Sequence, residues 1–331
     1  MSAIRLGTRR SALAVTQSGA VADLIRALGY EVELVEITSE GDRSQAAGTP
    51  LTQVSTTGVF VNALRDALLD GRIDAAVHSL KDLPTYAAEG IALVAIPPRE
   101  DPRDVVVARD GLTLGELPEG ARVGTGSPRR AAQLHALGLG LQIDGVRGNV
   151  DTRIGKVRSG EFDAVVLARA GLARIGRLDE VTEVLDPLQV LPAPGQGALA
   201  VECRAEDELT ELLGMLDDPF TRACVEAERA VLATLEGGCA APIGTLAEIV
   251  EAEPEVDSDE VSTELWVRAV ALSPDGALSV RKSAYGRVED AVGVGTRLAS
   301  EMLEDGAAEL AGVDDKGGDA DGAAPELDEV R

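Results

Sequence analysis

The stretch GTGSPRR at residues 124–130 follows an expected strand and opens an expected helix. Backbone N–H groups at the start of such a helix bind anions, and Ser127, Arg129 and Arg130 would reinforce that site. The stretch is neither the GxGxxG fingerprint of dinucleotide binding nor a P-loop, and the sequence offers no matching magnesium ligands. These features argue against a nucleotide-using enzyme.

Two further turns repeat this design. VRGN at residues 146–149 leads into a helix that carries Arg153, and TRRS at residues 8–11 leads, as a weaker instance, into another. A planar guanidinium binds a carboxylate through paired hydrogen bonds, and each charge-assisted bond contributes about 1.5–3 kcal/mol net. Three such turns favour a ligand with several carboxylates over a single phosphate. The alternative is that some of these arginines only cap helices or tie domains together.

The stretch HSLKDLP at residues 78–84 lies just beyond the carboxyl end of an expected strand. Ligands of α/β sheets bind at that edge, so Asp82 beside Lys81 could stabilise a developing cation or move protons. Taken alone, the motif fits a structural turn with a Lys–Asp pair better. His78 is expected to be a core residue and is given no catalytic role.

Cys239 lies in LEGGCAAPI at residues 235–243, after two glycines and before a proline. Glycines beside a cysteine allow an electrophile to approach the sulfur, whose thiolate is the reacting form. The other cysteines, Cys203 and Cys224, fall on an apolar strand and a helix and are expected in the core. The three show no CxxC spacing, so neither a disulfide framework nor a zinc site is indicated. No metal is expected.

The net charge of −26 over 331 residues disfavours nucleic acid and anionic membranes as partners. The charge is unevenly distributed, because residues 122–177 carry nine arginines and one lysine against four acids. We expect an anionic ligand there, although solvated arginines on helix surfaces are an alternative. Only Lys81, Lys156, Lys282 and Lys316 are lysines. An acidic, lysine-poor surface is typical of a salt-rich cytoplasm, where self-repulsion is screened.

No window of the sequence approaches the roughly 18 consecutive apolar residues of a membrane span. The first residues also lack the succession of regions that marks a signal peptide. We therefore expect a cytoplasmic protein without membrane association.

The elements that must position these motifs alternate between strand and helix. Expected strands at residues 4–7, 31–38 and 73–78, with helices at 11–28 and 59–69, indicate a parallel α/β sheet. The proline-rich stretch 96–102 interrupts this pattern, which then restarts with strands near 104–108, 122–124, 141–146 and 163–167 and helices from 128 and 149.

A second proline- and glycine-rich stretch, PAPGQG at residues 192–197, precedes a strand at 198–202. Two such crossings around one domain predict a chain that enters domain 2 and returns to domain 1, with a cleft between them. Helices near 206–216, 221–235 and 288–310 and strands near 245–252, 265–272 and 278–285 indicate a small α+β third domain. The acidic run 251–260 is expected to form a long hairpin. Our expected boundaries are 3–96 with 197–216, 99–193, 218–313, and a disordered acidic tail at 314–331.

Eight motifs together resemble the hydroxymethylbilane synthase (porphobilinogen deaminase) family. In chain order they are TRRSALA, HSLKDLP, EDPRDV, GTGSPRR, RGNVDTR, AGLARIG, APGQGAL and LEGGCAAP, and the resemblance runs from about residue 4 to residue 310. It implies two α/β domains like those of periplasmic binding proteins, with an interdomain cleft, and a small α+β C-terminal domain.

The same resemblance implies the following roles. Cys239 would carry a dipyrromethane cofactor through a thioether, and Asp82 would be the catalytic carboxylate. The matching positions that bind acetate and propionate groups of cofactor, porphobilinogen substrate and growing chain are Arg9, Ser11, Ser79, Lys81, Ser127, Arg129, Arg130, Arg147, Arg153 and Arg174. The implied reaction is a transfer in which four porphobilinogen molecules are deaminated and joined head to tail. A monomer is expected, with hand-over of product to uroporphyrinogen-III synthase.

One departure from the family concerns LTQVSTTGVF at residues 51–60, where many members have two lysines. Gln53 and Thr57 stand there instead, so those lysine contacts do not carry over. A non-catalytic receptor for small anions remains the alternative function, because an arginine-lined cleft would suit it. That alternative gives LEGGC and the third domain no purpose.

Overall fold

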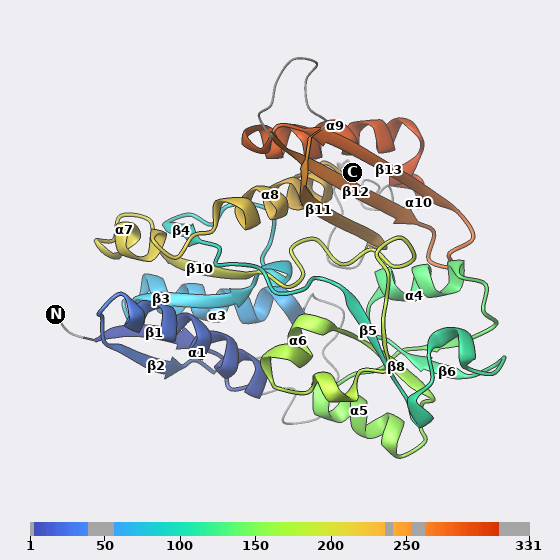
Figure 1. Cartoon of the computed structure of the whole chain (residues 1–331). Helices are drawn as coiled ribbons and strands as arrows, with labels where there is room; N and C mark the ends of the chain where they lie inside the picture. The colour runs from blue at the N-terminus through green and yellow to red at the C-terminus, as the bar shows by residue number, and fades with distance from the viewer. Residues whose placement is uncertain (1–2, 39–55, 236–240, 253–261, 311–331) are drawn as a thin grey trace, which may run out of the picture.

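The computed structural model describes residues 3–38, 56–235, 241–252 and 262–310, with the side chains of 56–60 left aside. Its strands form three sheets, two with five strands and one with three (Figure 1). The expected α/β class is thereby confirmed, with helices covering both faces of each larger sheet.

The first sheet has the strand order β2-β1-β3-β10-β4. Its elements are β1 (Ile4–Thr8), α1 (Ala12–Ala27), β2 (Val32–Glu36), α3 (Thr56–Leu69), β3 (Ala75–Ser79), the short 3-10 helix η1 (Leu80–Asp82), β4 (Ile91–Ala95), β10 (Leu199–Arg204) and α7 (Leu209–Gly214). Successive residues of β3 face opposite sides: Val77 packs in the cluster that holds Val21 of α1, and Ala76 packs with Leu64 of α3.

The second sheet has the order β7-β6-β8-β5-β9. Its elements are β5 (Asp104–Ala108), β6 (Arg122–Gly124), α4 (Pro128–Ala136), β7 (Gln142–Asp144), α5 (Val150–Arg158), β8 (Ala164–Ala168), α6 (Arg169–Arg174) and β9 (Glu183–Val184), with 3-10 turns η2 (Arg109–Gly111), η3 (Leu114–Glu116) and η4 (Leu178–Glu180). Val106 packs with Leu134 of α4, whereas its neighbour Val107 packs with Ile154 of α5.

The first sheet is mixed, where the sequence predicted parallel strands. β1, β2 and β3 are parallel, but β10 runs antiparallel to β3 and also pairs with β4, a strand that the sequence reading missed. The physical reason is that β10 comes after the second crossing and enters the sheet from the opposite end. In the second sheet β5 is likewise antiparallel to β8.

The two crossings between the larger sheets lie side by side. The Glu100 N–H donates to the Gly197 carbonyl at 3.3 Å. Gly197 has a φ of +90°, and a Cβ there would lie 2.3 Å from the Glu100 carbonyl oxygen, so no other residue fits without movement. A glycine is therefore required where the chain passes back.

The third sheet is antiparallel, in the order β11-β12-β13. Its elements are α8 (Pro219–Thr234), β11 (Ile243–Glu251), β12 (Thr263–Leu272), β13 (Ser279–Gly286), η5 (Val288–Asp290), α9 (Ala291–Glu304) and α10 (Ala307–Leu310). Val231 of α8, Leu298 of α9 and Val267 of β12 share one buried core. The run expected as a long hairpin lies mostly at 253–261, outside the described residues, but the flanking β11 and β12 do pair.

Candidate carboxylate-binding active site

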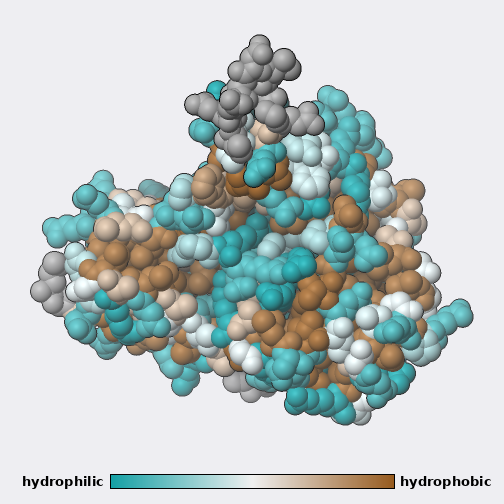
Figure 2. All heavy atoms as spheres, viewed as in Figure 1, coloured by the Kyte–Doolittle hydropathy of each residue, from teal (hydrophilic) through white to brown (hydrophobic). Residues whose placement is uncertain are grey.

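A cavity of about 320 Å³ lies between elements of the two larger sheets. Its lining comes from the start of α1, the end of β3 with η1, and residues 196–198 on one side, and from α4, α5 and the β8–α6 junction on the other. Figure 2 shows hydrophilic surface gathered in the middle of the view, between the two lobes. The expected cleft is therefore present.

Seven of the residues expected to bind carboxylates line this cavity. They are Arg9, Ser11, Ser79, Lys81, Arg130, Arg153 and Arg174. Within the part of the chain that the structure describes, Asp151 is the acidic residue on the lining. The excess of cationic groups over carboxylates favours an anion with several charges as the ligand of this cavity.

Ser11 and Ser79 are held by hydrogen bonds at the domain 1 side. The Ser11 Oγ accepts from the Ala14 N–H at 3.3 Å as the N-cap of α1, and the Ser79 Oγ accepts from Gln17 Nε2 at 2.9 Å. Capping satisfies a helix N–H that would otherwise lack a partner. Gln17 also lines the cavity, but it could not be predicted as a site residue because it lies within an ordinary amphipathic helix.

Arg153 and Arg174 point their guanidinium groups at backbone carbonyls of the cavity wall. Arg153 Nε donates to the Gly148 carbonyl at 2.8 Å, and Arg174 Nη2 donates to the Gly197 carbonyl at 2.6 Å. Burial lowers the pKa of both side chains, and the charge of Arg130 lowers that of Arg153 further. Desolvated guanidiniums next to one another gain most when an anion binds between them.

The residues of the GTGSPRR turn have different structural roles. Ser127 caps α4 by accepting from the Arg130 N–H at 3.4 Å, and Pro128 begins the helix. Arg129 is buried, donates to the Leu191 carbonyl, and its Nη2 lies 2.8 Å from Asp104 Oδ2. Neither Ser127 nor Arg129 is among the residues that line the cavity, so their contacts in the described structure are structural.

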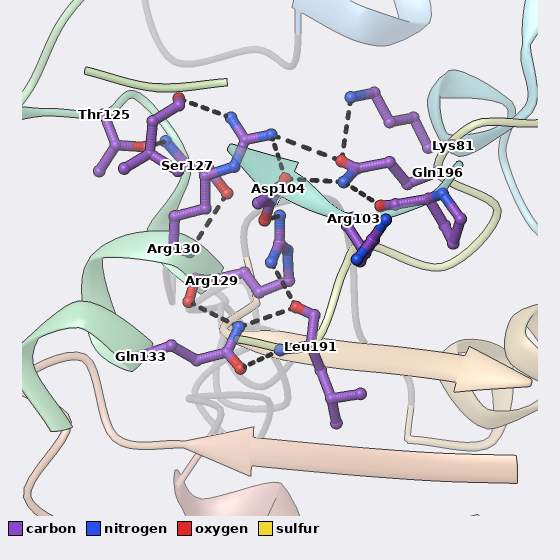
Figure 3. Close-up of polar contacts among 12 residues, drawn as sticks. Lys81, Arg103, Asp104, Thr125, Ser127, Arg129, Arg130, Gln133, Leu191 and Gln196 are labelled. Carbon is purple, nitrogen blue, oxygen red and sulfur yellow. Dashed lines mark hydrogen bonds and ion pairs between the residues drawn. The ribbon is translucent and has the colours of Figure 1, made fainter. Parts of the chain in front are cut away.

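Asp104 is the centre of a buried polar network (Figure 3). Arg130 Nη2 lies 2.7 Å from Asp104 Oδ1, and Arg129 Nη2 lies 2.8 Å from the other carboxylate oxygen, Oδ2. Burial opposes ionisation of Asp104, but the charges of Arg129 and Arg130 outweigh it and hold the carboxyl pKa well below its ordinary value. The sequence did not predict a role for Asp104, because the EDPRDV motif resembles the ordinary start of a strand.

Lys81 reaches the cavity from η1. Burial, followed by the charge of Arg130, lowers the pKa of its ammonium group from 10.5 to about 8. The negative charge of the adjacent Asp82 acts in the opposite direction. Asp82 itself is half-buried at the end of η1 and is not on the cavity lining.

The turn that carries Asp82 is tied to the C-terminal domain. Arg229 of α8 donates from Nη1 to the Leu83 carbonyl at 3.0 Å and from Nη2 to the Pro84 carbonyl at 2.5 Å. α8 ends at Thr234, five residues before Cys239. Cys239 and Gln53 lie outside the described residues, as does the side chain of Thr57, so the thioether position is not placed here.

Other predicted residues lie elsewhere. Arg147 is exposed and not among the cavity-lining residues. Cys203 and Cys224 are buried free cysteines, and burial raises the pKa of both thiols, so they are core residues as expected. His78 is also buried, with Nε2 3.2 Å from Glu202 Oε2, which confirms it as a core residue.

The described residues include no cluster of three or more His, Cys, Asp or Glu side chains that could hold a metal ion. Across the same ranges, no helix is long and apolar enough to cross a bilayer.

Comparison with known families gives two matches. Residues 4–211 match the family described as "Porphobilinogen deaminase, dipyromethane cofactor binding domain", and residues 222–304 match "Porphobilinogen deaminase, C-terminal domain". Proteins named porphobilinogen deaminase are similar along most of their length. The one from Mycobacterium tuberculosis is 57% identical over 93% of this chain and 98% of its own, and that from Mycobacteroides abscessus is 55% identical over 93% and 99%.

Two solved structures also show some likeness. A putative methionine-binding lipoprotein from Bacillus subtilis gives a TM-score of 0.39 at 13% identity, covering 64% of this chain and 88% of its own. The periplasmic aliphatic sulphonate binding protein from Escherichia coli gives 0.38 at 17% identity, covering 71% of both chains. Similarity at this level says nothing about the ligand.

Proposed function

The chain belongs to the porphobilinogen deaminase family, and from this premise we propose how its residues divide the work of the reaction. The reaction is that of a hydroxymethylbilane synthase, a transferase that deaminates four porphobilinogen molecules and joins them into a linear tetrapyrrole. Its cofactor is dipyrromethane. The observation that carries the assignment of residues is the cavity lined by Arg9, Lys81, Arg130, Arg153 and Arg174.

The donor set of this cavity fits a dipyrromethane. Each pyrrole ring of that group bears an acetate and a propionate, and the cavity offers cations from both larger sheets together with the hydroxyls of Ser11 and Ser79. When bound, the cofactor would supply the free pyrrole α-carbon for bonding to the first unit, and the terminal pyrrole of the growing chain would supply it for each later one. Lys81 and Arg130 would hold its carboxylates and, with Ser11 and Ser79, those of the porphobilinogen unit that binds beside it.

We assign the attachment point to Cys239, with a thioether as the bond. Thioether formation requires a nucleophilic sulfur on a segment that an electrophile can approach, and the glycines at 237 and 238 provide such flanks. The other two cysteines are buried with raised thiol pKa values, which leaves them poor nucleophiles.

Asp82 is our proposed catalytic carboxylate. As ammonia leaves porphobilinogen, positive charge develops on the pyrrole, and a carboxylate next to the ring N–H stabilises it. Asp82 ends η1 directly after Lys81, whose side chain lines the cavity, and this position supports the assignment. Arg9, Arg153 and Arg174 would orient the acetate and propionate of the incoming unit, and Arg147 is assigned to the same recognition by its family position. Ser127 and Arg129 are assigned to cofactor binding, which they support by capping α4 and by holding Asp104 beside Arg130.

The test of this assignment is a comparison of Asp82→Glu and Asp82→Ala with the unmodified chain. Both variants should keep the covalent cofactor, because its attachment lies elsewhere, and both should lose most of their turnover of porphobilinogen. Removal of a group that stabilises transition-state charge typically costs about 10²–10³ in rate. Full turnover in Asp82→Ala would remove this residue from its proposed role.

Further properties complete the proposal. We propose a cytoplasmic monomer of halophilic type, with the domain boundaries 3–96 with 197–216, 99–193, 218–313 and a tail at 314–331. The charge of −26 and the scarcity of lysine support the halophilic adaptation. Hand-over of the product to uroporphyrinogen-III synthase is proposed because a reactive linear tetrapyrrole needs prompt consumption.

A further inference from the structure

Gln196 is a buried side chain of the second crossing, and all hydrogen-bonding positions of its amide are used. Its Nε2 donates to the Pro102 carbonyl and to Asp104 Oδ1, both at 2.7 Å. Its Oε1 faces two cations, with Lys81 Nζ at 3.4 Å and Arg130 Nη2 at 3.5 Å (Figure 3). A carboxamide offers two donors and two acceptor positions, so this side chain is saturated.

The anchors of Gln196 determine which way its amide points. Pro102 contributes a carbonyl oxygen and Asp104 a carboxylate, and both can only accept from the amide NH₂. A flipped amide would place its oxygen against these acceptors and its NH₂ against Lys81 and Arg130. The oxygen is therefore held toward the two cations.

Those two cations come from opposite sides of the cavity and repel each other. Arg130 lies on α4 and is anchored by Asp104 and by the Val166 carbonyl at 3.1 Å. For Lys81, Gln196 is the hydrogen-bonding partner found among the described residues. The positive charge of Arg130 contributes to the lowered pKa of Lys81, as expected for two cations that repel each other.

Resting on the proposed function, we propose that Gln196 is a positioning residue, whose amide oxygen holds the Lys81 ammonium and the Arg130 guanidinium side by side as one receptor for a ligand carboxylate. A neutral acceptor suits this task because it bridges two cations without cancelling the charge that attracts the ligand. Gln196 also links the two interdomain crossings, because it belongs to the second crossing and its amide nitrogen donates to the Pro102 carbonyl of the first and to Asp104.

The experiment uses the full-length chain, in both the native and the Cys239→Ser background. Gln196→Met keeps the length of the side chain but removes its acceptor together with the two donors to Pro102 and Asp104, and Gln196→Asn keeps the amide on a shorter arm. Each lysine is acetylated competitively with limiting acetic anhydride and quantified by mass spectrometry. The sequence has four lysines, so Lys156 provides an internal surface reference.

Loss of the acceptor destabilises the Lys81 ammonium and increases the neutral, reactive form. At pH 7 the reactivity of Lys81 relative to Lys156 should rise about threefold or more in Gln196→Met in the Cys239→Ser background, which corresponds to a pKa lower by about half a unit. The shift should be smaller in Gln196→Asn. In the native background, KM for porphobilinogen should rise about tenfold, with kcat changed less than about threefold, because ground-state and transition-state binding are weakened together.

Gln133→Met is the matched control. Gln133 is a buried glutamine of α4, and its side-chain hydrogen bonds within the described ranges go to the backbone of Leu191 and Arg129. It should lower stability without altering Lys81 reactivity or KM. Unchanged Lys81 reactivity and KM in a folded Gln196→Met or Gln196→Asn chain would overturn the proposal, as would an equal effect in the control. An absence of cofactor mass on Cys239 would instead contradict the proposed function. The Lys81 acetylation could still be interpreted, because it is also measured in the Cys239→Ser background.

Discussion

The guanidinium of Arg229 donates to the carbonyl oxygen of Leu83 at 3.0 Å. Leu83 directly follows Asp82, and Arg229 belongs to the helix that leads toward Cys239. The turn with the proposed catalytic carboxylate is thus fixed to the domain with the proposed attachment site, and the two are positioned together.

Replacement of Arg229 by methionine should therefore misplace Asp82 without preventing cofactor attachment. A charged hydrogen bond contributes about 1.5–3 kcal/mol, so we expect kcat to fall about tenfold or more with little change in KM. Arg222→Met is the control, because Arg222 lies on the same helix but pairs with Asp217 and Glu226. An equal loss of kcat in both variants would show that the effect comes from the helix and not from the Asp82 turn.

The pH dependence of substrate capture should follow Lys81. Its pKa is lowered to about 8, and the ammonium form is the one that binds a carboxylate. Binding through the Lys81 ammonium is thus greatest well below pH 8 and is lost as the pH rises through that value, so kcat/KM should fall on the alkaline side. Lys81→Arg stays protonated well beyond this range and should flatten the profile. The same alkaline decline in both proteins would exclude Lys81 as its source.

The buried network around Asp104 should dominate the stability of the second domain. Asp104→Asn leaves Arg129 and Arg130 buried with a weakened partner, which should cost about 3–5 kcal/mol of unfolding free energy. The exposed pair of Glu36 with Arg10 provides the comparison, since Glu36→Gln should cost only about 0–1 kcal/mol. Urea denaturation measures both.

The Asp104 contribution should also depend on pH. Its folded-state pKa is depressed, so the stabilisation is present above the ordinary value of 3.8 and is lost as the pH falls below it. The difference between Asp104→Asn and the unmodified chain should accordingly shrink under acid conditions. A difference that stays constant with pH would contradict an ionised Asp104.

The sequence predicted the fold class and most elements because hydrophobic periodicity and glycine or proline breaks mark them locally. It could not predict that β10 would run antiparallel to β3, because strand pairing depends on contacts distant in the chain. The same limit applies to the site. Arginines beside helix starts were visible as motifs, whereas the role of Gln196 depends on Lys81 and Arg130, which are 115 and 66 residues away.

Arg129 illustrates a second limit. Its position in GTGSPRR is as suggestive of ligand binding as that of Arg130, yet it is buried against Asp104 and Leu191. Both guanidiniums reach Asp104, but within the described residues Arg130 also lines the cavity and Arg129 does not, so a motif alone cannot assign each arginine to ligand or to structure.

Stability should increase with salt if the acidic surface is an adaptation to it. Raising KCl from about 0.1 M to about 2 M shortens the Debye length from about 10 Å to about 2–3 Å and screens the repulsion among the surface carboxylates. The melting temperature should rise by several degrees, with the gain concentrated in the lower part of this range. A melting temperature that falls with added KCl would contradict the halophilic proposal.

The most direct test of the account is the intact mass of the purified full-length chain. We expect the mass of the polypeptide plus two linked pyrroles, carried on the peptide that contains Cys239, and a positive reaction with a pyrrole aldehyde reagent. Cys239→Ser should show the bare mass of the polypeptide and no turnover. An active unmodified chain with the bare polypeptide mass would contradict the covalent primer on which every proposed role depends.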